Sequence, residues 1–143
     1  MLGRELNDDQ DIAATYYVTI KLLSETSGGT SPIYKIVDAS AWSEARRDGA
    51  FRGAPVDFAD GYIHLSAAHQ VCETAAKHFA GKPDLLLVAY DPAVFGDALK
   101  WEVSRGGDRF PHLYAALDPA QALWAKPLPL GADGAHDWTG LLS

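Results

Sequence analysis

The stretch that decides the fold is GYIHLS, residues 61–66. Its tyrosine, isoleucine and leucine favour strands, and they follow a glycine. Ser66 is a good N-cap residue, because its side-chain oxygen can accept hydrogen bonds from the free N–H groups of a helix that begins near Ala67. The pattern predicts that a strand gives way to a helix here, with His64 at the junction. Ligands often meet free backbone N–H groups and the positive end of a helix at such a junction.

The size and composition are those of a single globular domain. The chain has 143 residues, of which 48% are hydrophobic and 22% charged, which is enough to bury a real core. The formal net charge is −7, and Arg46-Arg47 is the only basic pair, which argues against a nucleic-acid backbone as partner. The single cysteine, Cys72, excludes an internal disulfide and a cysteine-based zinc site.

The sequence predicts a cytoplasmic protein. No apolar segment approaches the length of a membrane span, so no membrane partner is expected. Acidic residues near the start, among them Glu5 and Asp8, argue against a signal peptide.

The first 32 residues differ in composition from the rest of the chain. Residues 6–10 are acidic and polar, and residues 24–32 (SETSGGTSP) have the composition of a linker. Residues 16–23 between them have the pattern of a strand or an edge element. We therefore expect a flexible N-terminal extension over residues 1–32. The remainder, 33–143, is predicted to be a single domain with a loose tail from about residue 131.

Within this domain the hydrophobic pattern indicates more strands than helices. Strands are expected at residues 34–37, 62–65, 85–90, 98–103 and 123–128, and Gly106-Gly107 is expected to turn the chain toward residues 110–114. The strand at 85–90 is apolar on both faces, which predicts a central position in the sheet.

Helices are expected in three places. Ser40 is predicted to cap a helix that runs to about Arg47 and ends at Gly49. A second helix is expected over 67–80, and a one-turn helix after Asp118-Pro119. Residues 51–60 are expected to form a loop. Because strands and helices do not alternate regularly, the sequence favours an α+β fold over a doubly wound sheet.

Three residues are candidates for catalysis. His64 and His112 each lie among aromatic and aliphatic residues, and the alternative for each is a core histidine with satisfied hydrogen bonds. Glu102, which follows Trp101 near the end of a strand, is either an exposed strand residue or a carboxylate held in an aromatic pocket. If His64 faces a cleft, we expect one of its ring nitrogens to be free for a ligand.

Other polar and aromatic side chains are candidates for ligand binding. Tyr62 and Tyr114 are suited to form stacking walls, and Ser66 is either a helix cap or part of the site. Asp57 and Asp60 are interpreted as turn formers. No metal site is expected from the two candidate histidines and Glu102, because no histidine pair has ligand spacing with an acidic partner. Nucleophile-elbow, P-loop and dinucleotide-binding glycine motifs are absent.

Two blocks together suggest a family. GYIHLS at 61–66 and FPHLY at 110–114, with Trp42 and Trp101-Glu102, resemble the small bacterial domain-of-unknown-function family 952 over about residues 33–130. The resemblance implies a compact α+β fold similar to that of the ADP-ribosyltransferases. In such a fold a small split mixed sheet with a few helices holds a dinucleotide in a cleft.

The resemblance also implies a function. It suggests that the partner is a small-molecule or nucleotide ligand bound in a cleft, with NAD as a possible cofactor, and it suggests glycosyl or ADP-ribosyl transfer. His64 would then bind a ribose or phosphate, Glu102 would stabilise a cationic ribosyl centre, and His112 would serve as acid, base or ligand donor. The first strand, YKIV at 34–37, lacks the histidine or arginine with which ADP-ribosyltransferases hold the cofactor. The alternative is therefore a non-catalytic ligand-binding module on the same fold.

Overall fold

The computed structural model describes residues 5–7, 9–11 and 31–142, with side chains from residue 31 onward except that of Arg105. The chain divides into two units, Met1–Ser31 and Pro32–Ser143. In the first unit, β1 (Glu5–Asn7) pairs antiparallel with β2 (Asp9–Asp11). The strand suggested for residues 16–23 lies outside the described residues.

Deleting residues 1–30 is expected to leave the second unit folded. The deleted residues are polar and rich in turn formers, whereas both hydrophobic cores of the described chain are built from Ile33 onward. Thermal melts should show a shift in Tm below about 4 °C, which corresponds to less than about 1 kcal/mol. Deleting residues 131–143 is the contrasting variant, because it removes the buried Leu141, and it should lower Tm more. A larger loss from the N-terminal deletion would contradict the prediction.

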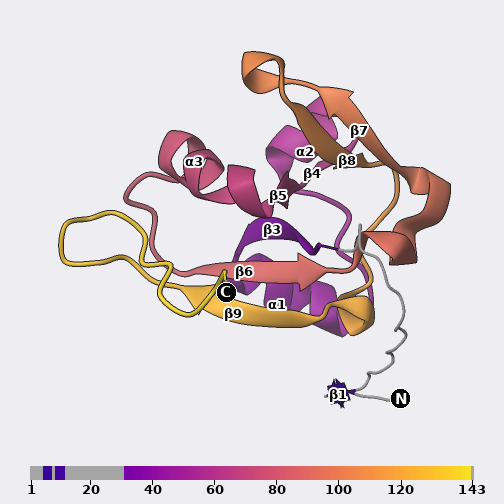
Figure 1. Ribbon diagram of the computed structural model, residues 1–143, viewed down its shortest axis with the longest axis horizontal. Coiled ribbons are helices and arrows are strands. Elements are labelled where there is room, and N and C mark those ends of the chain that lie inside the picture. Colours follow the sequence, from indigo (N-terminus) through magenta and orange to yellow (C-terminus); the bar gives the residue numbers. More distant parts are fainter. Residues whose placement is uncertain (1–4, 8, 12–30, 143) are drawn as a thin grey trace. The chain divides into compact units, whose positions relative to one another are not determined.

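The second unit contains two antiparallel sheets (Figure 1). The larger has the order β5-β3-β6-β9, with bounds Ser66–Ala67, Ile33–Asp38, Leu85–Tyr90 and Trp124–Leu128. The smaller has the order β4-β8-β7, with bounds Ile63–His64, Arg109–Leu113 and Leu99–Val103. The strand at 85–90 is interior, as predicted. The sheet is split, but every pairing in the second unit is antiparallel, so the expectation of a mixed sheet was wrong.

The GYIHLS stretch connects the two sheets. β4 belongs to the smaller sheet and β5 to the larger, and Leu65 alone separates them. Leu65 is buried, and its N–H donates to the carbonyl of Pro111 at 3.1 Å. His64 and Ser66 therefore stand on different sheets, one residue on either side of the crossing point.

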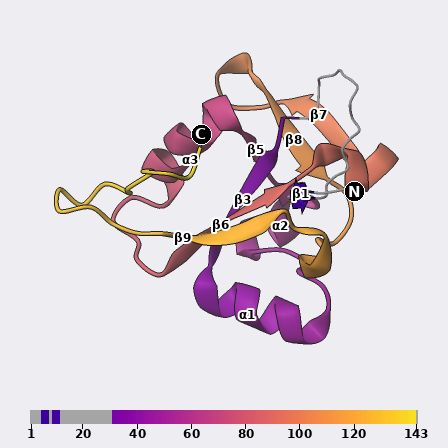
Figure 2. The same cartoon turned by 60° about the horizontal axis from the view of Figure 1, so that its bottom comes forward.

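Helices cover both faces of the larger sheet (Figure 2). α1 (Ala39–Asp48) packs through Trp42 and Ala45 on the face that carries Ile33 and Val37. α3 (Ala68–His78) packs on the opposite face, where its buried residues Val71 and Ala75 meet Tyr34, Ile36 and Leu87. The period of two along β3 thus sends alternate side chains into two separate cores.

The helix boundaries differ from the predictions at three points. The N-cap of α1 is Asp38 and not Ser40. Residues 51–60 are not all loop, because α2 (Pro55–Asp60) has proline at its first position and ends before Gly61, whose φ is 88°. The predicted end of α1 at Gly49 is confirmed, with φ of 86°.

The third difference concerns Ser66. α3 has Ala67 as its N-cap, and the Gln70 side chain accepts from the Ala67 N–H at 2.9 Å. Ser66 lies in β5, and its hydroxyl is 3.3 Å from that of Thr74. Ser66 is therefore not a helix cap, because the helix begins one residue later than the pattern indicated.

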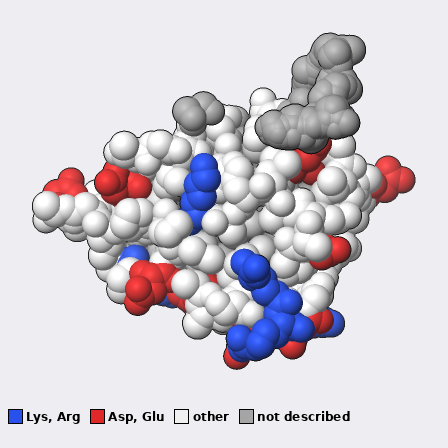
Figure 3. Space-filling view, turned by 90° about the horizontal axis from the view of Figure 1, so that it is seen from below, with Lys and Arg blue, Asp and Glu red and all other residues white. Residues whose placement is uncertain are grey.

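Short 3-10 helices and a packed C-terminal segment complete the unit. Their bounds are Pro92–Ala98, Arg105–Gly107 and Pro119–Gln121, and the last confirms the turn predicted after Asp118. The segment expected to be loose from about residue 131 contributes the buried Leu141 to the core under α3. On the face shown in Figure 3, Lys and Arg side chains form separate small groups, some of them beside Asp and Glu side chains. Arg46 and Arg47, in the last turn of α1, are exposed.

Candidate functional site

The smaller sheet brings five of the six candidate residues together. β4 pairs with β8 so that His64 lies opposite His112, and their ring centroids are 5.7 Å apart. Tyr62 stacks on His112 with ring centroids 4.0 Å apart, and its ring is 5.4 Å from that of Tyr114. Glu102 arrives from β7, on the other side of β8. Residues from three segments, ten or more positions apart, therefore share one cluster.

Glu102 holds the ring of His112. The His112 Nδ1 atom donates to Glu102 Oε1 at 2.8 Å, and the Tyr114 hydroxyl donates to the same oxygen at 2.8 Å. The His112 side chain is only 3% exposed. A hydrogen bond from Nδ1 to a carboxylate places the proton of the neutral ring on Nδ1 and leaves Nε2 as an acceptor. In the part of the chain that the structure describes, this Nε2 atom has no hydrogen-bond partner.

The same contacts shift the pKa values of the two partners of His112. Hydrogen bonds from His112 and then Tyr114 lower the pKa of the partly exposed Glu102 carboxyl. The pKa of Tyr114 is raised, mainly because its hydroxyl donates to Glu102 and ionisation would remove that donor. Glu102 is therefore an ionised acceptor that fixes the orientation of His112.

A buried ion pair between Asp57 and Lys35 holds the His64 ring in place. Asp57 is 2% exposed and receives the Lys35 ammonium at 2.9 Å and 3.2 Å on its two oxygens. It also accepts from the backbone N–H groups of Ala54 at 2.7 Å and His64 at 3.0 Å. The His64 Nδ1 atom donates to Asp57 Oδ1 at 2.6 Å. Lys35 in turn donates to the His64 carbonyl at 3.0 Å.

Burial and polar contacts shift the pKa values of Asp57 and Lys35 in opposite directions. Burial raises the pKa of Asp57, but the hydrogen bond from His64, the charge of Lys35 and the backbone donors together hold it well below its usual range. Burial lowers the pKa of Lys35, and the nearby Asp57 carboxylate opposes that shift. Three acceptor contacts on Lys35 Nζ identify an ammonium ion that is neutralised inside the protein.

The second ring nitrogen of His64 is also occupied. Nε2 lies 2.8 Å from Oδ2 of Asp60, the last residue of α2. The prediction of a free nitrogen on His64 was therefore wrong. The side chain is 32% exposed, so the alternative of a fully buried core histidine does not hold either. His64 is a surface-edge residue held between two carboxylates.

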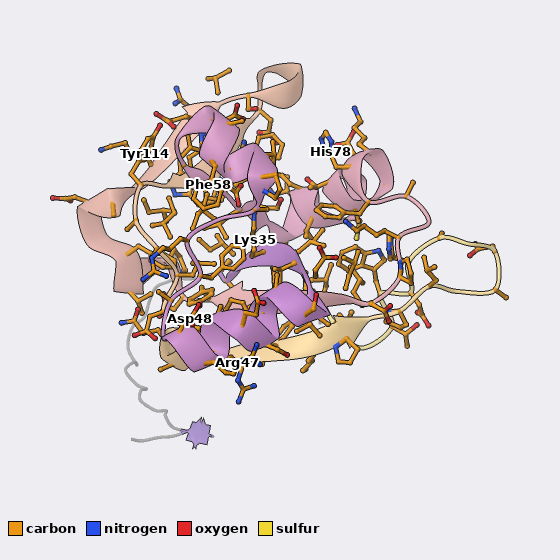
Figure 4. All side chains as sticks on the ribbon, turned by 180° about the vertical axis from the view of Figure 1, so that it is seen from behind. Lys35, Arg47, Asp48, Phe58, His78 and Tyr114 are labelled. Carbon is orange, nitrogen blue, oxygen red and sulfur yellow. The ribbon has the colours of Figure 1, made fainter. Side chains whose placement is uncertain are left out.

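A cavity of about 790 Å³ lies beside Lys35, His64 and His112. Its lining includes Lys35, His64, Ser66, Thr74, Phe110 and His112. The cavity continues along β3 and reaches His78, and Figure 4 shows Lys35 in the middle with His78 to one side. Tyr62 and Tyr114 line a separate hollow of about 320 Å³ with Phe58, which Figure 4 shows on the same side as Tyr114.

The comparisons with known proteins identify the family. The family model described as "Protein of unknown function (DUF952)" matches residues 36–125. The chain belongs to this family. The crystal structure of the protein CC0527 from Caulobacter crescentus is 48% identical, with a TM-score of 0.72 over 75% of this chain and 94% of that chain. The solution structure of CC0527 is 47% identical, with a TM-score of 0.70 over 76% and 93%. No curated protein matches the chain.

Ser66 lies apart from the aromatic cluster of this DUF952 protein. It lines the large cavity and is hydrogen-bonded to Thr74 of α3, but it stands on the other sheet from His64.

The described residues contain no group of three or more His, Cys, Asp or Glu side chains that could hold a metal ion. Over the same described residues, none of the helices has the length and hydrophobicity that crossing a membrane would require.

Sequence reasoning missed two residues of this DUF952 site. The sequence pattern predicts only a turn former at Asp57, and it marks the strand of Lys35 only by the absence of a histidine or arginine. A usable signal was present in the sequence, because Lys35 is the one charged residue in the otherwise apolar and aromatic run IYKIV at 33–37. A lysine in that position requires a buried counter-ion.

Proposed function

We propose that this DUF952 protein binds a nucleotide, NAD-like or related, in the 790 Å³ cavity and catalyses glycosyl transfer of the ADP-ribosyl type. The observation that carries the proposal is the buried His112, whose Nδ1 is held by Glu102 while its Nε2 has no partner among the described residues. A ring held in this way beside a cavity suits general acid–base catalysis.

The shape of the cavity supports a ligand of this size. Its volume of about 790 Å³ falls within the range of about 300–1,000 Å³ that ligand sites occupy. It lies where the two parts of the split sheet separate. An ADP-ribosyltransferase-like fold would hold a dinucleotide at the corresponding place. Aliphatic and aromatic side chains such as Ile36, Phe79 and Phe110 line it, together with polar and charged side chains that can orient a ligand.

The proposed reaction assigns a distinct role to each polar group. The acceptor hydroxyl loses its proton to Nε2 of His112 as its oxygen bonds to the anomeric carbon of the ribose. The glycosidic bond to the nicotinamide breaks at the same carbon, and the nicotinamide leaves as a neutral molecule. Glu102 stabilises the imidazolium that forms on His112, so in this proposal it is a positioning residue. His64 provides a hydrogen bond to a ribose or phosphate oxygen.

A second candidate is a non-catalytic ligand-binding module. The observation in its favour is that the charge of Lys35, the cation on the first strand of the domain, is already neutralised by Asp57. Lys35 therefore cannot replace the histidine or arginine with which ADP-ribosyltransferases grip their cofactor.

Binding is tested by titrating NAD and ADP-ribose against the wild type, His64→Ala and His69→Ala, with calorimetry and thermal melts. NAD should raise Tm of the wild type, because it binds only the folded protein. His64→Ala should weaken binding about tenfold through loss of one charged hydrogen bond. His69→Ala is the matched control, because His69 is 72% exposed and does not line the cavity.

The outcomes separate the two candidates. Release of nicotinamide by the wild type would support catalysis, and stabilisation without release would support the binding module. Absence of any stabilisation by millimolar NAD or ADP-ribose would contradict both. Equal weakening by His64→Ala and His69→Ala would remove His64 from the site.

A further inference from the structure

His64 is held by two carboxylates that differ in their surroundings. Asp57 is 2% exposed and fixed by Lys35 and two backbone N–H groups. Asp60 is 46% exposed, and within the described chain the contact with His64 Nε2 is the only hydrogen bond of its side chain. The Nδ1 contact is therefore part of the core, whereas the Nε2 contact lies at the surface and can open.

The two contacts together define what His64 offers to a ligand. Ionised carboxylates only accept hydrogen bonds, and a neutral imidazole has a single N–H. Both contacts, at 2.6 Å and 2.8 Å, are satisfied by the doubly protonated ring. Its Nε2–H is then a charged donor that already binds an oxyanion, the carboxylate of Asp60, and both residues line the 790 Å³ cavity.

The charges around the ring favour an anion at this position. Lys35 and Asp57 neutralise each other, so the protonated ring leaves a net charge of about +1 once Asp60 moves away. Helix α2 gives no reason for a carboxylate at its last residue, because the C-terminal end of a helix is the negative end of its dipole. The carboxylate of Asp60 is thus explained by its contact with His64.

We infer that Nε2–H of His64 is a phosphate-binding site, that Asp60 occupies it in the free protein, and that a phosphate group of the ligand displaces Asp60. The inference rests on the proposed function and deepens it, because it names the part of the ligand that His64 binds. The bond exchanged is a hydrogen bond, so Asp60 acts as an internal competitor.

Removing the competitor should strengthen phosphate binding. The probe is inorganic phosphate, whose affinity is measured by calorimetry at one pH in every variant, and in the wild type and Asp60→Ala the ring signals of His64 are also followed by NMR. If the open state is populated to about a tenth in the wild type, Asp60→Ala should bind phosphate about tenfold more tightly. Asp60 is exposed, so the variant should fold, and a melting curve checks this.

Two variants distinguish a site from a general charge effect. Asp38→Ala removes one negative charge from the lining of the same cavity, where Asp38 is paired with Lys82 at 3.6 Å and not with His64. In the double variant Asp60→Ala/His64→Ala the gain should disappear. An equal gain in Asp38→Ala, or a gain that persists in the double variant, would overturn the inference.

A parallel titration with NAD separates this inference from the proposed function. If NAD binds the wild type but Asp60→Ala gains nothing for phosphate, the inference fails and the function stands. If Asp60→Ala gains phosphate affinity through His64 but NAD never binds, the nucleotide function fails and the phosphate site stands.

Discussion

Asp57→Ala is expected to lower the free energy of unfolding by about 3–5 kcal/mol, because it leaves the Lys35 ammonium buried without a counter-ion. The substitution also removes the acceptor for the N–H groups of Ala54 and His64 and for Nδ1 of His64. Urea denaturation of the wild type and the variant measures the difference.

Two further variants make this result specific. Asp60→Ala removes an exposed carboxylate from the same helix and should cost less than about 1 kcal/mol. Replacing both partners with apolar residues of similar size, Lys35→Met with Asp57→Leu, should recover the part of the loss that comes from the uncompensated Lys35 charge. The N–H groups of Ala54 and His64 stay without their acceptor in this double variant. If Asp57→Ala costs no more than Asp60→Ala, the account of a buried ion pair is wrong.

The pH dependence of stability gives a second readout of the same substitution. The folded-state pKa of Asp57 lies below its unfolded value of about 4, so its contribution is fully present above that value. The contribution is lost as the pH falls toward the folded-state pKa, since the unfolded chain then binds the extra proton. The unfolding free energy of the wild type should therefore rise between about pH 2 and pH 5. In Asp57→Asn this part of the rise should be absent.

The parts of the fold that the sequence predicted are those with strong local patterns. The strand at 85–90 is apolar throughout, and Gly49 follows a helix with basic residues in its last turn, so both signals are contained in a few residues. α2 was missed because six residues are too few to show a helical period. The predicted helix cap at Ser66 was wrong because the N-cap of α3 is the next residue, Ala67, whose N–H donates to the side chain of Gln70.

The sequence singled out the residues of this cluster but not their contacts. His64, His112 and Glu102 were chosen from their local surroundings, and the register that places them side by side is a property of strands far apart in sequence. Asp57 reaches Lys35 across 22 positions, so its role as a buried counter-ion follows only from the folded chain. The free energy of such a pair depends on burial, which a local pattern does not give.

His112→Ala is expected to abolish most of the turnover that the proposed function requires. Removing a general acid–base group typically costs about 10²–10⁴ in rate, and His112 is the only ring in the cluster whose second nitrogen is unpartnered among the described residues. Nicotinamide release under saturating NAD is the measurement. The loss should fall on kcat, with KM little changed, because the proton transfer takes place only in the transition state.

Glu102→Gln tests how His112 is held, and Val103→Ala is the control. Glutamine can still accept a hydrogen bond from Nδ1 of His112, but it provides no charge to stabilise the imidazolium, so kcat should fall by less than in His112→Ala. Val103 follows Glu102 on β7 and is 61% exposed, and because adjacent strand residues point to opposite faces, its truncation should leave the rate unchanged.

A His112→Ala variant that releases nicotinamide at the wild-type rate would rule out His112 as the acid–base group. If His112→Ala, Glu102→Gln and Val103→Ala all bind NAD as tightly as the wild type, and the wild type releases no nicotinamide, the protein is the non-catalytic binding module.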